Sequence, residues 1–405
     1  MEKQYDVVLY GATGFTGRQS AAWFQRHAPS GLRWAVAGRR ENALAEVAEK
    51  TGAHGRIVAD STDKDSIGRM VMNTRVLLTT AGPYYKYGDP VVDACVDHGV
   101  HYVDITGETP WVADVIDRHH AAASDKGIRI VPFCGFDSVP SDLGALILAT
   151  EMRHRFGVGV RSMLATFRLR GGFNGGTVDS ALHMAEIQQN RRLADPLLLN
   201  PLSHRSDEER RRSRDFRTVR HDATRNVWLA PFIMSMINSR VVRRSNALRD
   251  IYREGTYGNE FRYDEAMEFK SRFQATQMGL ALLALERGLR SKNGRALIRK
   301  FTPNPGSGPS ESSIANGFMR VRHVGVADDG RKLMLTTASD GDPGNHITVA
   351  ALCECALLLA TTPGAELPGG SSRGGVLTPA TAFGLPLRAR LERVGFTFEL
   401  SDVPA

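Results

Sequence analysis

The chain has 405 residues, of which 42% are hydrophobic and 24% are charged, and its formal net charge is +8. This ordinary composition excludes a disordered, collagenous or fibrous chain and predicts two or three globular domains. Four cysteines are too few for a disulfide framework, and the N-terminus has no long apolar leader, so we expect a cytoplasmic protein. The two most apolar segments, 227–238 and 347–362, are predicted to be buried, because the first is too short to span a membrane and Glu354 interrupts the second.

The first 135 residues alternate between strand patterns and helix patterns. Apolar runs typical of buried strands occur at 5–10, 33–37, 56–59, 75–80, 101–105 and 128–133. Helical patterns lie between them, at 15–28, 41–51, 63–72, 88–98 and 110–126. This alternation predicts an α/β fold with an N-terminal Rossmann-type, doubly wound parallel sheet that carries helices on both faces.

The loop after the first strand has the spacing of a dinucleotide-binding turn. Its glycines, Gly11, Gly14 and Gly17, form a GxxGxxG motif between a strand and an amphipathic helix. The first glycine permits the tight turn, the second lets the backbone approach a pyrophosphate, and the third lets the helix pack on the strand. The phosphates then lie at a helix N-terminus, where free N–H groups favour negative charge. The residues expected to bind the dinucleotide are Gly11, Thr13, Gly14, Phe15, Thr16 and Gly17.

The end of the second strand selects between NAD and NADP. An acidic residue there binds the ribose 2′-hydroxyl of NAD, whereas the 2′-phosphate of NADP needs positive charge. Arg39 and Arg40 stand at this point and no acid precedes Glu41, which favours NADP (NADPH) as the cofactor. We expect Arg39 to bind the phosphate, and Arg40 either to stack on adenine or to face solvent. Asp60, after the third strand, is either an adenine contact or the N-cap of the next helix.

The loop after the fourth strand is a second expected ligand contact. Ligands of open α/β sheets bind beyond the carboxyl ends of the strands, so Ala81, Gly82 and Pro83 are expected to run beside the nicotinamide ribose. Tyr84 either faces the reactive ring or belongs to the core. No tyrosine in the chain has a lysine four residues later, so the Tyr-x-x-x-Lys dyad of short-chain dehydrogenases is absent. We therefore expect a separate substrate domain.

Polar side chains also follow the sixth strand, in the sequence CGFDSVPSDLG. Cys134 is a candidate proton donor or a core residue. Asp137 is a candidate contact to the nicotinamide amide or to the substrate. Ser138, Ser141 and Asp142 are further candidates for such contacts; alternatively, Ser141 or Asp142 caps a helix over 143–152.

The second half of the chain is basic. Residues 1–135 carry 15 basic and 16 acidic side chains, so residues 136–405 carry a balance of +9. Much of it lies in Arg-rich stretches at 205–225, 240–253 and 287–300. These are either a solvated surface or a face for an anionic partner, such as phospholipid or a phosphopantetheine carrier. Nucleic acid is not an expected partner, because no motif for it is present.

Two further features of the second half stay open. The glycine-dense stretch 171–177 is either a close backbone approach to a ligand or a turn before a helix at 178–190. The apolar segment 227–237, followed by RVVRR, suits an acyl chain with a phosphopantetheine thioester, a membrane surface, or ordinary core. The histidines lack metal-ligand spacing, so we expect no metal site.

Taken together, these motifs resemble the saccharopine dehydrogenase-like oxidoreductases, and within them the trans-acting enoyl reductases of actinobacteria. In the first 144 residues the resemblance rests on YGATGFTG, AGR, TTAGPYYKYG, HYVDITGE and CGFDSVPSDLG. Beyond them it rests on GGTVDS, RVVRRSNAL, GDPG and GGVLTPATAFG. It therefore touches nearly the whole chain.

The resemblance implies three regions: an NADP-binding Rossmann domain over 1–140, an α+β substrate domain over 141–345, and a C-terminal segment over 346–405 that packs back towards the first domain. It also implies an enzyme that acts in trans for a polyketide synthase during synthesis of cell-envelope lipids. The expected partner is an acyl chain on a polyketide synthase carrier domain, or a small-molecule substrate. Peripheral membrane contact and an oligomer both stay open.

Three functions compete at this point. The first is NADPH-dependent reduction of an enoyl thioester, in which donors stabilise an enolate and an acid protonates its α-carbon. Tyr84, Cys134 and Asp137 are the candidate donors. The second is a saccharopine-type dehydrogenase acting on an imine or amino acid, against which the apolar segment 227–237 counts. The third is a non-catalytic, lipid-associated protein that binds NADP.

Overall fold

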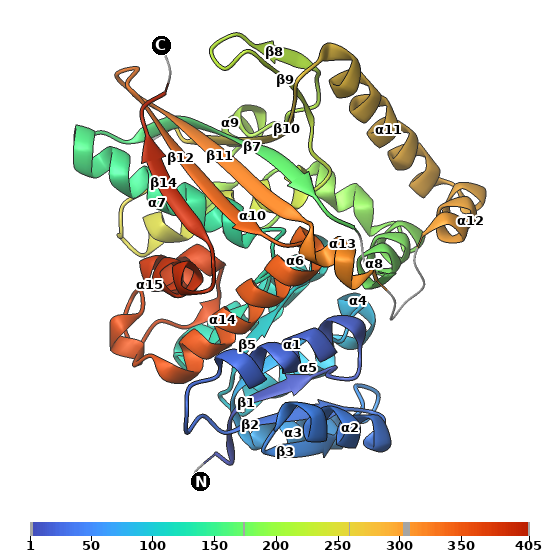
Figure 1. Ribbon diagram of the computed structural model, residues 1–405. Coiled ribbons are helices and arrows are strands. Elements are labelled where there is room, and N and C mark those ends of the chain that lie inside the picture. The colour runs from blue at the N-terminus through green and yellow to red at the C-terminus, as the bar shows by residue number, and fades with distance from the viewer. Residues whose placement is uncertain (1–2, 173–174, 259, 303–307, 404–405) are drawn as a thin grey trace.

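The computed structural model describes residues 3–172, 175–258, 260–302 and 308–403, and within them it has two seven-stranded sheets (Figure 1). The first sheet has the order β13-β6-β5-β4-β1-β2-β3, and every pair in it is parallel. Its strands are β1 (Tyr5–Tyr10), β2 (Trp34–Gly38), β3 (Gly55–Val58), β4 (Thr74–Thr79), β5 (His101–Asp104), β6 (Arg129–Val131) and β13 (Gly375–Val376). The helices that follow these strands up to residue 125 are α1 (Phe15–His27), α2 (Glu41–Thr51), α3 (Lys64–Met72), α4 (Tyr84–Tyr87), α5 (Asp89–Asp97) and α6 (Thr109–Asp125).

The Rossmann-type sheet expected from the alternating pattern is confirmed. Each of the six expected strands lies within about two residues of its observed place, and so do the helices between them. Successive residues of β1 point to opposite faces: Val7 and Leu9 pack with α1, α2 and α14, and Val8 and Tyr10 pack with α3, α5 and α6. Burial on both faces explains why these strands are continuous apolar runs.

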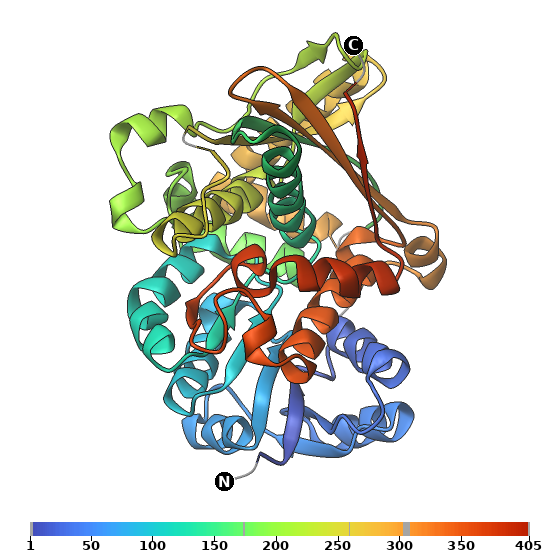
Figure 2. The same ribbon diagram turned by 90° about the vertical axis from the view of Figure 1, so that its left-hand side faces the viewer.

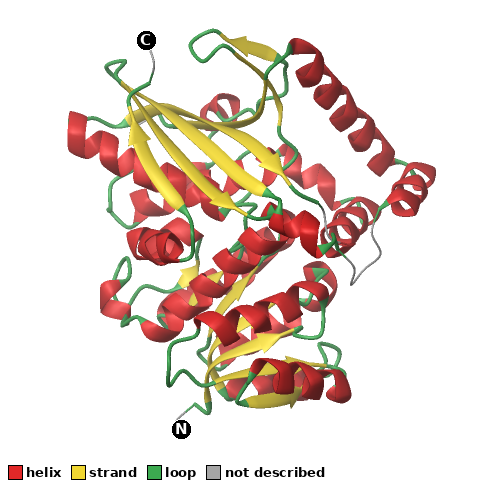
Figure 3. Cartoon of the chain, viewed as in Figure 1, coloured by secondary structure: helices red, strands yellow, loops and turns green. Residues whose placement is uncertain are grey.

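The second sheet is mixed and has the order β14-β12-β11-β7-β10-β9-β8, in which only β7 and β10 run parallel (Figure 3). Its strands are β7 (Val160–Arg170), β8 (Arg220–Asp222), β9 (Val227–Pro231), β10 (Arg262–Phe269), β11 (Phe318–Ala327), β12 (Lys332–Asp340) and β14 (Thr397–Ser401). Its helices are α7 (Val139–Phe156), α8 (Gly175–Glu186), α9 (Asp207–Arg212), α10 (Ser235–Ile251), α11 (Arg272–Arg290), α12 (Lys292–Phe301) and α13 (Glu311–Ala315). The C-terminal helices are α14 (Thr348–Thr361) and α15 (Pro379–Arg393), and the short helical turns are η1 (Gln189–Ala194), η2 (Leu202–His204), η3 (Pro343–Ile347) and η4 (Gly364–Glu366).

The last sixty residues join both sheets. β13 extends the first sheet beside β6, and β14 extends the second sheet beside β12. Between them, α14 packs on α1 and the first sheet, α15 packs on α14 and α7, and α7 covers one face of the second sheet (Figure 2). The two sheets therefore share a continuous core.

The most apolar helix of the chain lies inside this core. Residues Pro343–Thr361 are long and apolar enough to cross a membrane, but most of that stretch is buried in the protein. Glu354 on it is satisfied by the Trp23 indole N–H at 3.1 Å and by Arg390 at 2.8 Å. The expectation that 347–362 is buried is confirmed. In the other apolar segment, Leu229 and Phe232 are buried, while Ile233 is exposed.

Two expectations about local structure are wrong. The helix expected over 143–152 begins earlier, at Val139, and Ser138 occupies its N-cap position. Pro140 accounts for the early start, because proline suits the first helical turn, where its missing N–H is not needed. Ser141 and Asp142 therefore lie inside α7 and do not cap it.

The Arg-rich stretch 240–253 is neither a solvated surface nor a face for an anionic partner along α10. Arg240, Arg243 and Arg244 on this helix are all buried. Arg240 pairs with Asp215 at 2.6 Å, and Arg244 donates to the Val376 carbonyl at 2.6 Å. A buried arginine is tolerated only when it is paired, and here the partners lie in other parts of the sequence.

Candidate functional site

The carboxyl ends of the first sheet's strands and the loops that follow them form the candidate site. We call this region the carboxyl edge, and its loops are 11–14, 39–40, 80–83, 105–108 and 132–138. Parallel strands bring these loops to one side of the sheet, where open α/β folds bind their ligands.

The glycine-rich loop has the local geometry that an anion requires. Gly11 has a φ of +85°, which a side chain rarely adopts. A Cβ on Gly17 would lie 2.2 Å from the Gly11 carbonyl oxygen, so only glycine lets α1 pack on the turn. By contrast, a Cβ on Gly14 would meet nothing closer than 3.3 Å, and Gly14 is exposed. The N-cap residue of α1, Gly14, has no side chain that could cap the first N–H groups of the helix.

Arg39 and Arg40 follow β2 and are both exposed. The Asp60 carboxylate accepts hydrogen bonds from the Thr62 backbone N–H at 3.0 Å and the Thr62 hydroxyl at 2.9 Å. These bonds and the nearby charge of Arg39 lower the pKa of Asp60. The N-cap of α3 is Asp63, so the alternative that made Asp60 the cap is wrong. Asp60 instead lies beside Arg39 at the end of β3.

Tyr84 belongs to the core of the carboxyl edge. It is 5% exposed, and its hydroxyl donates to the Thr79 carbonyl at 3.2 Å. Burial raises its pKa well above the usual value. Of the residues before it, Gly82 is exposed and Ala81 and Pro83 are partly exposed, so they form the accessible part of the loop.

Glu108 holds this loop in place, a role that sequence reasoning missed. The side chain is buried, and its two carboxylate oxygens accept the backbone N–H groups of Tyr84 and Tyr85 at 2.9 and 2.8 Å. These bonds fix the start of α4 and thereby the loop in front of it. The signal was an acidic residue in a loop directly after a buried strand, in HYVDITGE.

Asp104 ties together the loops after β5 and β6. The buried carboxylate accepts the Tyr102 hydroxyl at 2.7 Å, the Thr106 N–H at 3.0 Å and the Phe133 N–H at 3.2 Å. Burial raises its pKa to about 7. Phe133 has a φ of +65°, an unfavourable conformation for a residue with a side chain. The Asp104 bond to its N–H stabilises that conformation.

Cys134 and Asp137 differ sharply in their surroundings. Cys134 is fully buried, its thiol lies 3.2 Å from the Val131 carbonyl, and burial raises its pKa. Asp137 is half-buried, and burial raises its pKa to about 6. Within the described parts of the chain, no hydrogen bond to the Asp137 carboxyl group is found. Asp137 is thus the candidate donor whose acidic group is uncommitted.

A buried polar network supports the loop that carries Asp137. Ser138 donates to the Asn238 side chain at 3.3 Å, and Asn238 donates to Glu265 at 2.9 Å. Glu265 also accepts the hydroxyls of Ser141 and Tyr263 at 2.6 and 2.8 Å. Burial raises the pKa of Glu265 to about 7. This network links α7, α10 and β10, and no local sequence pattern pairs its members.

Elements of the second sheet's domain reach the carboxyl edge. A Cβ on Gly82 would lie 3.9 Å from the Ser180 hydroxyl of α8. A Cβ on Gly308 would lie 2.3 Å from the Phe15 ring at the start of α1. The backbone N–H of Gly172 donates to Asp342 at 2.5 Å. Residues 173–174 of the glycine-dense stretch lie outside the described residues, and α8 begins directly after them.

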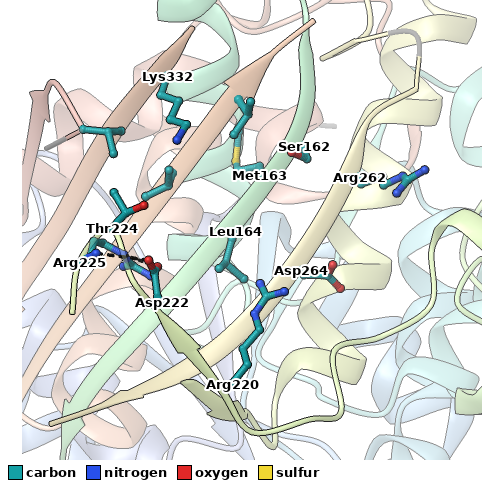
Figure 4. Close-up of a pocket in the computed structure, with 13 residues that line it drawn as sticks. Ser162, Met163, Leu164, Arg220, Asp222, Thr224, Arg225, Arg262, Asp264 and Lys332 are labelled. Atoms are coloured by element: carbon teal, nitrogen blue, oxygen red, sulfur yellow. Dashed lines mark hydrogen bonds and ion pairs between the residues drawn. The ribbon is translucent and has the colours of Figure 1, made fainter. Parts of the chain in front are cut away.

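A separate cavity of about 360 Å³ lies on the second sheet (Figure 4). Its basic lining includes Arg220, Arg262 and Lys332. All of its lining residues lie between 162 and 403, outside the loops of the carboxyl edge. This cavity is therefore not part of the candidate site.

Known proteins resemble this chain in two ways: one family matches its first domain, and several relatives match nearly its whole length. Residues 7–131 match the family described as the saccharopine dehydrogenase NADP binding domain. A trans-acting enoyl reductase of Mycobacterium ulcerans is 33% identical, and the alignment covers 97% of each chain. A Mycobacterium tuberculosis protein, provisionally named a trans-acting enoyl reductase, is 35% identical over 98% of this chain and 97% of its own.

Two solved structures share the fold over nearly the whole chain. The apo saccharopine dehydrogenase (L-Glu forming) of Saccharomyces cerevisiae has a TM-score of 0.57 and 12% identity, covering 98% of this chain and all of its own. The homospermidine synthase of Legionella pneumophila, solved with NAD, has a TM-score of 0.52 and 9% identity, covering 99% of this chain and 92% of its own. At these identities the likeness concerns the fold alone.

Proposed function

The chain belongs to the saccharopine dehydrogenase-like oxidoreductases, in the group of mycobacterial trans-acting enoyl reductases, and from this premise we propose that it reduces the carbon–carbon double bond of a carrier-bound enoyl thioester. The observation that carries the proposal is similarity to enoyl reductases over nearly the full length of both chains. The NADP-dependent oxidoreductase class is established by the same findings. The substrate and its polyketide synthase partner are the proposal.

The residues of the carboxyl edge fit NADP. The uncapped N-terminus of α1 offers N–H groups to the pyrophosphate, and Gly14 leaves space for it. Thr13, Phe15 and Thr16 complete this loop in the proposal, and Arg39 pairs with the 2′-phosphate. Arg40 and Asp60 lie next to Arg39, on the adenosine side.

NADPH, when bound, supplies a hydride to the β-carbon of the enoyl group. The chain's own part is to position the reactants and to manage charge and protons. Ala81, Gly82 and Pro83 are proposed to line the nicotinamide side, and Glu108 keeps their loop in one conformation through α4. A fixed loop lowers the entropy cost of aligning the reacting atoms.

Asp137 is the proton donor that we favour for the α-carbon. Its carboxyl group is uncommitted and half-buried, and a pKa of about 6 keeps a usable fraction protonated near neutral pH. Tyr84 and Cys134 are the other candidates, but their hydroxyl and thiol are turned to backbone carbonyls in the core. In this proposal both have a packing role.

The saccharopine-type alternative is less well supported by the arginines of the chain. A zwitterionic amino-acid substrate needs accessible arginines to bind its carboxylates. The arginines of the family motif RVVRR on α10 are buried and already paired within the protein. We also propose a cytoplasmic location, because all four cysteines are free thiols, as is usual in a reducing compartment.

NADPH consumption with a pantetheine-bound or carrier-bound trans-2-enoyl substrate tests the proposal. NADH, and a glutamate-plus-aldehyde pair, are run in parallel. We expect turnover of the enoyl compound with NADPH. We expect Asp137→Asn to lower kcat about 100-fold, the usual contribution of a general acid, while NADPH binding stays unchanged. Activity on the amino-acid pair alone would replace the proposal with the saccharopine-type reaction, and binding without any turnover would favour a non-catalytic role.

A further inference from the structure

Helices α11 and α12 form a hairpin at the side of the molecule (Figure 1). The described residues include twelve exposed large apolar side chains, and five of them lie on this hairpin. They are Phe273 (71% exposed), Leu280 (62%), Leu283 (43%), Leu297 (59%) and Phe301 (78%), and we call them the hairpin apolar face. The other seven are scattered over the rest of the chain. An exposed apolar cluster of this kind marks an interaction surface.

The spacing of these residues places them along the helices and away from the protein. Phe273 and Leu280 are seven residues apart on α11, and Leu297 and Phe301 are four apart on α12, so each pair shares a helix face. The hairpin is held by its other side, where α11 packs on β9 and both helices pack on α8. Within α11 only Ala275 is buried, and α12 has no buried residue.

The charge around the apolar face is strongly positive. Residues 272–301 contain seven basic residues and one acidic residue. Arg299 pairs with Asp179 at 3.2 Å. Among the described residues no ion pair is found for the other cations, which are Arg272, Arg287, Arg290, Lys292, Arg295 and Lys300. This surface therefore calls for an anionic partner.

We propose that the hairpin apolar face docks on the surface of an anionic lipid bilayer. Exposed Phe and Leu side chains enter the boundary between headgroups and acyl chains, and Lys and Arg pair with the lipid phosphates. A second copy of the chain is disfavoured, because a symmetric contact would bring two positive faces together. A bilayer is favoured over an acidic carrier protein, because it accepts the five apolar side chains of the hairpin without a matching groove.

Docking would bring the bilayer close to the candidate site. α12 is tied to α8 by the Arg299–Asp179 pair, and α8 lies against Gly82 of the carboxyl edge. A substrate with a long acyl chain would thus meet the enzyme at the membrane surface. The docking proposal stands on the hairpin alone and holds whether or not the substrate is an enoyl thioester.

Cosedimentation of the full chain with vesicles tests the proposal without any activity assay. One vesicle preparation is phosphatidylcholine mixed with phosphatidylglycerol, and the other is phosphatidylcholine alone. We expect strong binding to the anionic vesicles only. Phe273→Gln with Phe301→Gln should weaken it by roughly 100-fold, about tenfold for each buried aromatic ring lost from the lipid. Arg290→Gln with Lys292→Gln should weaken it by about 30-fold, and added salt should also weaken it.

The matched control is Leu202→Gln, since Leu202 is 84% exposed and lies on η2, outside the hairpin. Its vesicle binding should equal that of the unsubstituted chain. All substituted side chains are exposed, so thermal unfolding checks that each variant folds. The proposal is overturned if the anionic vesicles do not bind the chain, or if the aromatic variant binds them as well as the control does. Capture of the hairpin by an acidic carrier domain, or a change of oligomeric state in the aromatic variant, in place of vesicle binding, would also overturn it.

Discussion

The carboxyl edge and helix α10 both contain buried charged side chains, which are carboxylates at the carboxyl edge and arginines on α10. At the carboxyl edge, Asp104 and Glu108 accept backbone N–H groups of the loops that surround the candidate site. On α10, Arg240 and Arg244 donate to backbone carbonyls of segments packed around the helix. In both regions an ionisable side chain replaces regular secondary structure as the partner of loop backbone.

The two arrangements leave different backbone groups available. Carboxylates at the edge hold the loops behind the site, while at its front the N-cap residue of α1 makes no side-chain hydrogen bond to the first turn. The terminal guanidinium nitrogens of Arg240, Arg243 and Arg244 donate to Asp215 and to backbone carbonyl oxygens, and the Nε atoms of all three are buried. Family motifs rich in charge therefore have different roles: one set shapes a ligand site, and the other builds a core.

The largest expected loss of stability comes from removing the carboxylate that pairs with the arginines of α10. Asp215 is buried, and Arg240 and Arg243 both pair with it, lowering its pKa against the effect of burial. Asp215→Ala leaves two buried arginines without their carboxylate partner. We expect the free energy of unfolding in urea to fall by about 3–5 kcal/mol.

Asp329→Ala is the control for that loss, because the Asp329–Arg331 pair is exposed to solvent and should contribute little to stability. NADPH affinity of the Asp215 variant, measured under conditions where it is folded, should be unchanged. A comparable loss in both variants would contradict the core role of α10.

The pH dependence of stability distinguishes the carboxyl edge from α10. The pKa of Asp104 is about 7 when folded and near 4 when unfolded. The unfolded state thus loses its proton first, and the contribution of Asp104 to stability falls as pH rises from about 4 to 7. The slope is about 1.4 kcal/mol per pH unit inside this window. Arginine has no counterpart to this titration.

Asp104→Asn should remove that slope, because the amide keeps a hydrogen-bond acceptor and does not titrate. The measurement is the difference in unfolding free energy between the variant and the unsubstituted chain, from pH 4 to 8. The difference cancels the buried histidines, whose lowered pKa values act in the opposite direction. A flat difference curve would show that Asp104 does not titrate in this range.

Glu108→Gln sharpens the comparison within the carboxyl edge. Glutamine offers one acceptor where the carboxylate offers two, so one N–H of Tyr84 or Tyr85 loses its partner. We expect a loss of about 2 kcal/mol in unfolding free energy, and a weaker NADPH affinity because the adjacent loop loosens. Glu392→Gln, on an exposed pair with Arg388, is the control and should change neither. An unchanged NADPH affinity in Glu108→Gln would separate Glu108 from the cofactor loop.

Sequence reasoning succeeded where the signal was local. Six strands, their helices and the glycine turn follow from periodicity and from the conformations that only glycine adopts, as at Gly11. The elements depend on neighbours within a few residues, and so does the turn between β1 and α1.

Sequence reasoning failed where the partner was distant. Arg240 lies next to other arginines in the sequence, a pattern typical of a surface, and only Asp215 from another segment makes its burial tolerable. Glu354 interrupts an apolar run, and its partner Trp23 is 331 residues away. Asp142 stands just before the expected helix, a position typical of a cap. In the structure its carboxylate instead accepts hydrogen bonds from the Ser245 hydroxyl and the Ala380 N–H of two other helices. At such positions the sequence shows that a polar residue is present, but it does not show which distant residue is its partner.

The smallest effect on stability is expected at an arginine whose surroundings are the opposite of those on α10. Arg39 is exposed, and its proposed partner is the 2′-phosphate of NADPH. A charge-assisted hydrogen bond of this kind contributes about 2 kcal/mol, or roughly 30-fold in affinity. Arg39→Ser should therefore raise the KM for NADPH about 30-fold and leave the KM for NADH and the free energy of unfolding unchanged.

Arg40→Ser, one residue away and equally exposed, is the matched control and should shift the ratio of the two KM values little. If Arg40→Ser lowers the preference for NADPH and Arg39→Ser does not, the phosphate contact belongs to Arg40. If neither variant lowers the preference for NADPH, that preference comes from another part of the carboxyl edge. The end of β2 would then not provide a ligand-binding arginine to contrast with the buried arginines of α10.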